Sequence, residues 1–326
     1  MKAEILTLLR NSREYVSGQD LCARFGVSRT AVWKAINQLK EEGYEIEALQ
    51  NKGYILRSYP DILSKNEIAS RLGTKWVGKT LYYYEDTDST NADAMRLGEE
   101  GAEHGTLVVA NHQNKGRGRR GRVWQSPVGT TISMSFLVKP EIAPGKASML
   151  TLVMALAVAK GIEEACDLST AIKWPNDILV NGKKVCGILT EMKAEMDYIH
   201  GVIIGVGINV NVESFPEELQ SMATSLILEK GRKVSRAEVI ERVAENFEEY
   251  YEKFMETEDL SLLRDLYEER LISKGKAVKV LDPQGEYTGI SKGITDTGEL
   301  VVETQDGKEQ QVYAGEVSVR GIYGYV

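Results

Sequence analysis

The stretch from Gln113 to Trp124 reads QNKGRGRRGRVW and sets the character of the whole chain. Arginine offers a rigid fork of N–H donors, and glycine lets a backbone curl closely around an anion, so this stretch predicts a phosphate-binding loop. Ordering such a loop costs roughly 1–2 kcal/mol per residue in backbone entropy. We therefore expect a lid that is mobile when empty and that orders over a ligand offering charge-assisted hydrogen bonds. The alternating residues are Gly116, Arg117, Gly118, Arg119, Arg120, Gly121 and Arg122.

The flanks of this loop distinguish a lid from a tail. Arginine and glycine runs also occur in solvated loops and in tails that bind RNA. Here β-type runs stand on both sides, at 107–110 and 130–136, so the loop is expected to join two strands. The glycine spacing also matches a dinucleotide fingerprint and a kinase glycine-rich loop. Both are rejected, because Pro127, Gly129 and a β-branched run follow where the fingerprint requires a helix, and no other kinase motif is found.

The composition indicates an ordinary globular protein of two or three domains. Its 326 residues are 42% hydrophobic and 27% charged. Cys22, Cys166 and Cys186 are widely spaced without a CxxC pattern, which predicts reduced thiols in a cytoplasm, and three histidines are too few to favour a zinc site. The N-terminus has no secretory signal pattern, and the most apolar run, 149–159, is shorter than the roughly 20 residues of a membrane span. We expect no membrane segment.

Charge is distributed unevenly along the chain. The formal net charge is −8, but residues 1–60 carry nine bases against seven acids. This segment is therefore at +2, which leaves −10 for the remainder. A polyanion partner is expected to bind either the N-terminal segment or the arginine loop.

The pattern of residues 1–57 predicts a winged helix-turn-helix. Three helices and two short strands are expected, at 3–10, 17–25, 28–42, 44–47 and 54–56. A three-helix unit that binds only protein is the alternative, but a basic helix face and a basic wing tip favour DNA. The predicted DNA-binding residues are Ser28, Arg29, Thr30, Trp33, Lys34 and Asn37 on the third helix and Lys52 on the wing.

The remaining chain predicts an α+β multidomain protein. A central mixed α/β domain is expected from short strands around one long apolar helix at 147–164, and Ser235 is expected to cap an amphipathic helix. From Ala277 onward, short strands and Asp/Gly turns predict a small β-barrel of SH3 size. The predicted central strands are 81–85, 106–110, 131–137, 178–180, 187–190 and 202–208. The predicted domains are 1–62, 63–271 and 272–326.

Four short motifs of the central domain can carry chemistry. Ser89-Thr-Asn91 suits a neutral polar head group, although it also reads as a helix N-cap. Lys173-Trp-Pro-Asn-Asp177 places a cation, an aromatic ring, an amide and a carboxylate around a fixed turn, more than a plain turn requires. Lys184 could reach an anion or be a surface lysine. Gly205 and Gly207 permit close approach of a ligand or of another backbone, or serve only packing.

Together these groups resemble one family over essentially the whole chain. The chain resembles biotin–protein ligases (biotin–acetyl-CoA-carboxylase ligases), and its winged helix makes it similar to the bifunctional bacterial type that represses biotin genes. The resemblance implies a class II synthetase-like central domain and an SH3-like C-terminal β-barrel. The motifs that carry it are Ser89-Thr-Asn91, Gln113 with GRGRRGR, Ser126-Pro127, KWPND, KxxGIL, GxGxN at 205–209 and Ala223-Thr-Ser-Leu226.

The resemblance implies a two-step reaction. Biotin and MgATP would give biotinyl-5′-AMP and pyrophosphate, and the biotinyl group would pass to a lysine of biotin carboxyl carrier protein. A carboxylate with a pKa near 4.3 is ionised at neutral pH and can itself attack the α-phosphate, so no protein nucleophile is required. Alignment and charge stabilisation are left to the protein.

The resemblance also implies site residues and partners. The biotin ligands would be Ser89, Thr90, Asn91, Gln113, Arg117, Gly118 and Arg119, with Lys184 beside the carboxylate. The ATP ligands would be Arg119, Arg122, Lys173 and Asn176, and the catalytic set Lys173, Arg119, Asp177 and Lys184, where Asp177 would orient Lys173 or the incoming amine. No residue is assigned to Mg²⁺. The partners would be the carrier protein of acetyl-CoA carboxylase, with that of pyruvate carboxylase as a further candidate, operator DNA, and a second copy of the chain in a homodimer promoted by the adenylate.

Two rival functions stay open. One is a transcription factor that binds biotin without catalysis, which the KWPND motif and the four loop arginines argue against. The other is a ligase for lipoate or octanoate, which the pairing of Ser89-Thr-Asn91 with GRGRRGR argues against. Exchange of pyrophosphate into ATP, measured with biotin and with lipoate, distinguishes a biotin–protein ligase from both rivals.

Overall fold

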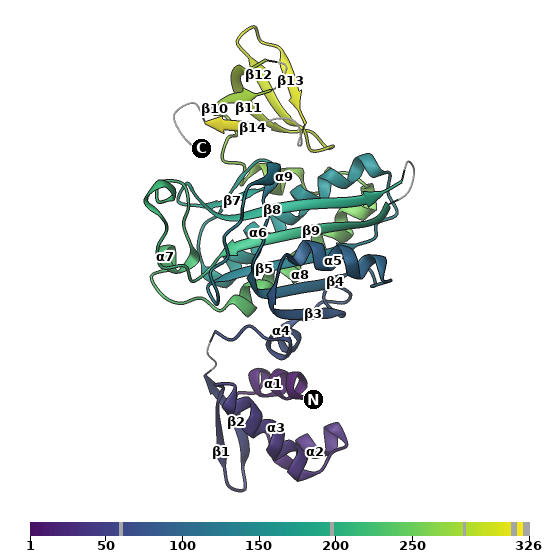
Figure 1. Cartoon of the computed structure of the whole chain (residues 1–326), viewed down its shortest axis with the longest axis vertical. Helices are drawn as coiled ribbons and strands as arrows, with labels where there is room; N and C mark the ends of the chain where they lie inside the picture. The colour runs from purple at the N-terminus through teal and green to yellow at the C-terminus, as the bar shows by residue number, and fades with distance from the viewer. Residues whose placement is uncertain (59–60, 196–198, 283–284, 314–317, 322–326) are drawn as a thin grey trace. The chain divides into compact units, whose positions relative to one another are not determined.

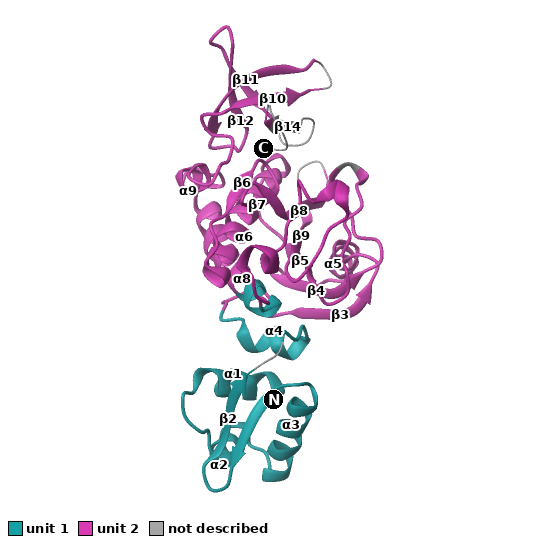
Figure 2. Ribbon diagram, turned by 90° about the vertical axis from the view of Figure 1, so that its left-hand side faces the viewer, with its two compact units in different colours: residues 1–73, 235–241 teal, residues 74–234, 242–326 magenta. Residues whose placement is uncertain are grey.

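The computed structural model describes residues 1–58, 61–195, 199–282, 285–313 and 318–321. The chain forms two compact units, coloured separately in Figure 2. The N-terminal unit comprises residues 1–73 and 235–241, and the catalytic unit comprises residues 74–234 and 242–326. Each unit is described by itself, and the three-domain division expected from the sequence stays a prediction.

The N-terminal unit contains the expected winged helix-turn-helix. Ser17 and Ser28 cap the second and third helices by accepting from the backbone N–H groups of Asp20 and Ala31, and Gly26 turns the chain between these helices with φ +64°. Leucine, isoleucine and valine side chains from all three helices form one buried core. The elements are α1 (Lys2–Asn11), α2 (Gly18–Phe25), α3 (Arg29–Glu41), β1 (Glu45–Leu49), β2 (Gly53–Ser58) and α4 (Lys65–Arg71).

The wing is held next to its turn by the segment that precedes α2. Tyr54 of β2 exchanges both backbone hydrogen bonds with Val16, at 2.8 and 2.9 Å. Gly53 has φ +118°, and a Cβ there would lie 2.1 Å from the carbonyl oxygen of Val16. Only glycine permits this approach, so the wing keeps its place beside the helices.

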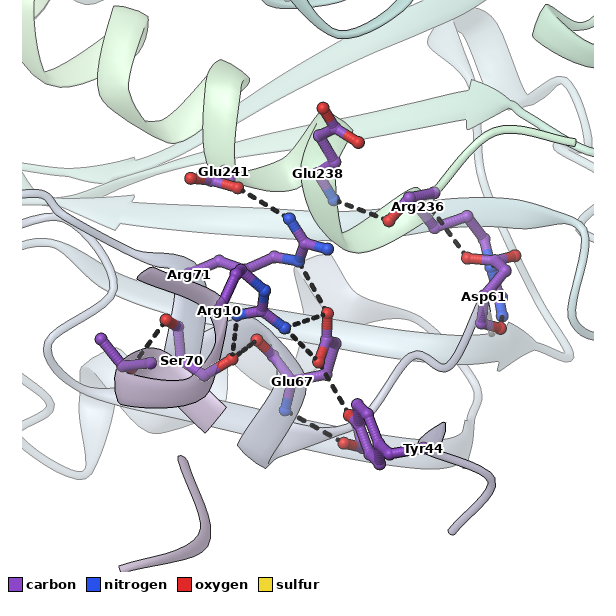
Figure 3. Close-up of polar contacts among 12 residues, drawn as sticks. Arg10, Tyr44, Asp61, Glu67, Ser70, Arg71, Arg236, Glu238 and Glu241 are labelled. Carbon is purple, nitrogen blue, oxygen red and sulfur yellow. Dashed lines mark hydrogen bonds and ion pairs between the residues drawn. The ribbon is translucent and has the colours of Figure 1, made fainter. Parts of the chain in front are cut away.

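Glu67 of α4 is the centre of a buried ion-pair cluster, which Figure 3 shows between two arginines and a tyrosine. Its carboxylate accepts from Arg10 at 2.9 Å, from Arg71 at 2.7 Å and from the hydroxyl of Tyr44 at 2.7 Å. Arg71 also pairs with Glu241 at 3.1 Å. Burial, with the adjacent Glu67 carboxylate, raises the pKa of Tyr44. These contacts tie α1 and α4 together through charge as well as apolar packing.

The catalytic unit is built on a seven-stranded sheet in the order β3-β4-β5-β9-β8-β7-β6, in which only β3 and β4 pair in parallel. Every strand expected in this part of the chain is present, which confirms the mixed α/β architecture (Figure 1). The strands are β3 (Leu81–Thr87), β4 (Thr106–Gln113), β5 (Thr131–Val138), β6 (Ala171–Lys173), β7 (Asp177–Val180), β8 (Lys183–Ala194) and β9 (Ile199–Asn209).

The long apolar helix and the amphipathic helix that the sequence predicts are both present, and both bury apolar side chains. The long apolar helix α6 (Leu150–Cys166) is preceded by a 3-10 turn, η2 (Pro144–Met149), so the predicted start at 147 falls within that turn. Helix α8 (Arg236–Thr257), whose first residues belong to the N-terminal unit, is capped by Ser235 as expected. The buried face of α8 includes Val239, Val243, Phe247, Tyr250 and Phe254. The other helices of this unit are α5 (Thr90–Glu99), α7 (Leu226–Lys230) and α9 (Arg264–Glu268), with short 3-10 turns η1 (Arg119–Gly121) and η3 (Glu217–Leu219).

The C-terminal part of the catalytic unit is a small antiparallel sheet in the order β13-β12-β11-β10-β14 (Figure 1). This result confirms the expected all-β domain. It contacts the central sheet domain directly, since the indole N–H of Trp174 donates to the carbonyl of Gly298 at 3.0 Å. Its strands are β10 (Ala277–Leu281), β11 (Tyr287–Ile294), β12 (Leu300–Thr304), β13 (Glu309–Val312) and β14 (Ser318–Gly321). Across the described ranges, no helix has both the length and the hydropathy needed to span a membrane.

Candidate active site

One cavity of about 1210 Å³ in the catalytic unit collects the residues that the sequence singled out. They come from the start of α5, the end of β4, the arginine loop, the β6–β7 turn and the start of β8. Segments up to 95 residues apart, from Ser89 to Lys184, therefore share a single site. The predicted residues that line it are Ser89, Thr90, Asn91, Gln113, Arg117, Gly118, Arg119, Arg122, Lys173, Asn176, Asp177 and Lys184.

The arginine loop folds back on itself as a short hairpin at the cavity wall. Gly118 N–H donates to Arg122 O at 2.7 Å, and Trp124 N–H donates to Gly116 O at 2.9 Å. A Cβ at Gly116 would lie 2.5 Å from the Trp124 carbonyl oxygen, so glycine is required for the hairpin to close. The loop does join two strands, β4 and β5, as expected. That it is mobile without ligand stays a prediction.

The turn between β6 and β7 connects the loop to the sheet. Asn176 accepts from Arg119 Nη1 at 2.9 Å and donates through Nδ2 to Ile188 O at 3.0 Å. The guanidinium of Arg119 is therefore aimed at the floor of the cavity by an amide that the sheet holds in place. The Trp174–Pro175 bond at this turn is cis.

Lys184 and Asp177 form an ion pair of 2.7 Å on neighbouring strands of the sheet. Lys184 is also placed by its backbone, which exchanges hydrogen bonds with Met222 and Thr224 at 2.8 and 2.9 Å. The Ala223-Thr-Ser segment therefore fixes the lysine through the main chain. With a side chain 27% exposed, Lys184 keeps access to the cavity.

Two glycines of β9 accommodate side chains, and both also line the cavity. A Cβ at Gly205 would lie 2.1 Å from Oδ1 of Asn91, and one at Gly207 would lie 2.5 Å from the indole of Trp124. Gly207 thus makes room for an aromatic ring that lines the cavity. The Lys184 ammonium lies 5.8 Å from the centre of the same ring, within cation–π range.

Comparison with known proteins gives the family. Residues 83–209 match the Biotin/lipoate A/B protein ligase family, residues 275–320 the Biotin protein ligase C terminal domain, and residues 2–55 an HTH domain. The bifunctional ligase/repressor BirA of Bacillus subtilis is 44% identical over 94% of both chains. The chain belongs to the family of bifunctional biotin ligase/repressors.

Other relatives agree with this membership in the biotin ligase/repressor family. The bifunctional ligase/repressor BirA of Escherichia coli is 30% identical over 97% of this chain and 96% of its own. A solved structure of the biotin protein ligase from Aquifex aeolicus, in complex with biotin and ATP, superposes with a TM-score of 0.65 at 34% identity. It covers 74% of this chain and 99% of its own length.

The DNA-binding residues predicted for this biotin ligase/repressor lie at the surface of the N-terminal unit. Along α3, Ser28, Arg29, Thr30 and Lys34 are exposed, Asn37 is half-buried, and the ring of Trp33 is 59% exposed. Lys52 is exposed at the wing tip, 6.0 Å from the centre of the Tyr15 ring. An exposed tryptophan in a basic helix face suits contact with a partner surface.

Sequence reasoning missed part of the cavity lining. The sequence motifs assign no role to Trp124, although Gly207 indicates a close approach at this point of the sheet. Among the described residues, the buried indole N–H of Trp124 has no hydrogen-bond partner. Phe215, Leu219 and Met222 add an apolar wall from the segment after β9, for which no pattern in the sequence gave a signal.

The described residues contain no group of three or more His, Cys, Asp or Glu side chains that could hold a metal ion. In the cavity, the one carboxylate of the KWPND motif, Asp177, is already paired with Lys184. Magnesium usually keeps several waters and binds one or two carboxylates together with substrate phosphates. We assign none of the described residues to Mg²⁺.

Proposed function

We propose that the chain activates biotin with MgATP to biotinyl-5′-AMP, transfers the biotinyl group to a lysine of biotin carboxyl carrier protein, and represses biotin genes from an operator. The observation that carries the proposal is the single cavity. Its lining combines the neutral polar side chains of Ser89-Thr-Asn91 and Gln113, here called the neutral end, with the cations of the arginine loop, the β6–β7 turn and β8, here called the cationic end. Such a lining suits an acid that reacts with a nucleotide.

The neutral end suits a cyclic urea. Thr90 and Gln113 present a hydroxyl and an amide oxygen 3.1 Å apart, and Ser89, although it is the N-cap of α5, makes no capping hydrogen bond. Ser126 holds the backbone of Gln113 at 3.1 Å. We assign the ring of biotin to this end and its carboxylate to the neighbourhood of Lys184.

The cationic end suits the phosphates. We assign Arg119, Arg122 and Lys173 to them and Asn176 to the adenine side, because all four line the cavity and Asn176 accepts from Arg119 at 2.9 Å. The ionised carboxylate of biotin attacks the α-phosphorus, and pyrophosphate leaves with the electron pair of the bond that breaks. The cations oppose the charge that builds up on the phosphate oxygens, which is the main contribution a protein makes to such a transfer.

In the second step, the uncharged amine of the carrier lysine attacks the carbonyl carbon of the mixed anhydride, and AMP leaves. Asp177 lies 2.7 Å from Lys184 and can hold that ammonium beside the reacting carboxyl group or accept a proton from the amine. The hairpin of the arginine loop excludes water while the anhydride waits for its acceptor. The Asp177 role stays part of the proposal.

Pyrophosphate exchange into ATP tests the catalytic proposal. The purified full chain should catalyse exchange with biotin and MgATP and should not do so with lipoate or octanoate at the same concentration. Exchange with lipoate alone would make the chain a ligase for another acid. Binding of biotin without exchange would leave a ligand-responsive transcription factor.

We also propose that the adenylate acts as corepressor by favouring a homodimer, so that two winged helices read an inverted repeat, and that the protein is cytoplasmic. The exposed residues of α3 and the wing support the DNA contact. Biotin with ATP should tighten operator binding in a gel shift, and unmodified carrier protein should weaken it. Equal affinity in all three conditions would refute the regulatory proposal.

A further inference from the structure

The neutral end of the cavity is held by a chain of hydrogen bonds that runs across three strands. Asn91 is 8% exposed and lies over Gly205 of β9. On one side it contacts Ser135 of β5, and on the other it contacts Glu191 of β8. Ser135 and Glu191 do not belong to the cavity lining, so they can act on a ligand only through other residues.

The orientation of the Asn91 amide is fixed by β8. Its Nδ2 group lies 2.7 Å from Oε2 of Glu191 and 3.2 Å from the carbonyl oxygen of Leu189. A carbonyl oxygen and an ionised carboxylate only accept hydrogen bonds, so the amide nitrogen must face them. The amide oxygen of Asn91 is thereby turned toward β5.

This orientation decides where the single proton of Ser135 goes. Oγ of Ser135 lies 2.6 Å from Oδ1 of Asn91 and 2.8 Å from Oγ1 of Thr90. An amide oxygen cannot donate, so the Ser135 proton is directed to Asn91. The contact between the two hydroxyl groups is then satisfied only if Thr90 donates to Ser135.

A pair of acceptors results at the cavity surface. Oγ1 of Thr90 lies 3.1 Å from Oε1 of Gln113, which already accepts from the backbone N–H of Thr90 at 2.8 Å. With the Thr90 proton directed at Ser135, no proton lies between these two oxygens. An N–H group of a ligand can supply it and bond to both.

We propose that Glu191 is a positioning residue that, through Asn91 and Ser135, sets the Thr90 hydroxyl as an acceptor for a ring N–H of the ligand. The inference rests on the proposed function, in which that ring is the cyclic urea of biotin. It assigns specificity for an N–H donor to a carboxylate outside the cavity. With an apolar group at position 191, the Asn91 amide would keep only its longer 3.2 Å contact with the Leu189 carbonyl, and the Thr90 proton could turn.

The test measures affinity by calorimetry on the full chain with two probes, biotin and its cyclic carbamate analogues, in which one ring N–H is replaced by oxygen. Glu191→Leu should weaken biotin binding roughly 3–15-fold, the worth of about one hydrogen bond. It should also reduce the preference for biotin over the carbamate that loses the Thr90 contact. Glu191→Gln keeps an acceptor oxygen for Asn91 and should stay within about twofold of wild type.

A double-mutant cycle separates this role from general damage to the fold. Thr90→Val removes the hydroxyl, so adding Glu191→Leu to it should cost no further biotin affinity, while the KM for ATP stays within about twofold. Equal losses in Glu191→Leu and Glu191→Gln, an unchanged preference over the carbamates, or a full additional loss in the double variant would overturn the inference. A wild-type chain that fails to bind biotin would instead overturn the proposed function, and the inference with it.

Discussion

The two units use arginine in opposite ways. In the N-terminal unit, Arg10 and Arg71 have side chains that are 15% and 4% exposed, and both pair with the buried carboxylate of Glu67 (Figure 3). In the catalytic unit, Arg117 and Arg122 are exposed at the cavity, and no ion pair is found for either within the described part of the chain. One pair of guanidinium groups receives its counter-charge from the fold, and the other is left to receive it from a ligand.

The difference is energetic as well as geometric. Burying a charge costs several kcal/mol, which is offset only when its partner is present with good hydrogen bonds. Glu67 supplies that partner within the fold, so removing Glu67 alone would take away the compensation for buried charge. An exposed arginine has little desolvation to offset, and a phosphate gives it a bidentate partner at the moment of binding. Mutations in the two regions should therefore separate stability from activity.

The largest effect is expected for Glu67→Ala. Removing the carboxylate takes away the Glu67 contacts of Arg10 and Arg71 and the acceptor of the Tyr44 hydroxyl, so the N-terminal unit should lose about 3–5 kcal/mol of stability. Hydrogen exchange of backbone amides in residues 1–58 of the full chain measures the loss. Pyrophosphate exchange with biotin should stay near wild type.

The control for this comparison is an exposed ion pair of similar length. Lys253 and Glu249 lie 2.7 Å apart on α8 with side chains 38% and 59% exposed. Glu249→Ala should change stability by less than about 0.5 kcal/mol. If Glu67→Ala were as mild as Glu249→Ala, the cluster would not hold the N-terminal unit together.

For Arg119→Ala we expect the opposite result, a loss of activity with stability retained. The variant should fold normally but form adenylate roughly 10²–10³-fold more slowly, as when one preorganised charge-stabilising donor is lost, or release the adenylate it forms. Pyrophosphate exchange and the amount of biotinyl-5′-AMP retained on the protein measure both outcomes. Arg96→Ala on the exposed face of α5 serves as the matched control. Retention of adenylate at the wild-type level and rate would contradict the role of the loop.

Local chemistry explains which features the sequence could predict. The helices and strands of residues 1–57, the Ser235 cap and the central strand runs each depend on a few neighbouring residues, and all are present as expected. The motif set likewise brought distant segments to one cavity, because each motif had a physical reason for its residue types.

Features that depend on contacts across the sheet could not be predicted from the sequence. Gly205 and Gly207 signalled close approach, but nothing in the pattern told that Asn91 and Trp124 approach them. The Asn91–Ser135–Glu191 contacts join three segments with no shared motif. The Glu67 cluster was missed for the same reason, since Arg10, Tyr44 and Glu67 are ordinary surface residue types until the fold buries them.

A smaller effect than that of Arg119→Ala is expected for Asp177→Asn, because Asp177 is already paired inside the cavity, as Glu67 is in the N-terminal unit. Asn keeps an oxygen that can accept from Lys184 but removes the charge of this 2.7 Å pair. We expect the rate of biotin transfer to fall roughly tenfold, the lower end for loss of a positioned acid–base or charged group, with the KM for ATP little changed. Single-turnover transfer from preformed adenylate to carrier protein measures it. A change confined to the KM for ATP would place Asp177 with the nucleotide instead.

The smallest effect concerns His104, a half-buried titratable group for which the described residues show no ion pair with a carboxylate. Its ring packs 4.5 Å from the ring of Trp76 and accepts at Nδ1 from the backbone N–H of Lys139 at 3.0 Å. Burial lowers the pKa of His104 below its ordinary value near 6.5. Above that value both the folded and the unfolded chain hold a neutral ring. As the pH falls through it, the unfolded chain takes up the proton first, so stability is lost down to the lower folded pKa.

Urea unfolding of the catalytic unit within the full chain, followed from about pH 7.5 to about pH 5, should therefore show a fall that His104→Gln reduces, since glutamine can still accept from Lys139 but does not titrate. The difference in slope cannot exceed about 1.4 kcal/mol per pH unit, the limit for a single proton. Identical pH profiles for the two chains would mean that the imidazolium is tolerated in place. The half-buried His104 ring would then resemble the buried Glu67 cluster, because some group near the histidine would be supplying a counter-charge to the imidazolium.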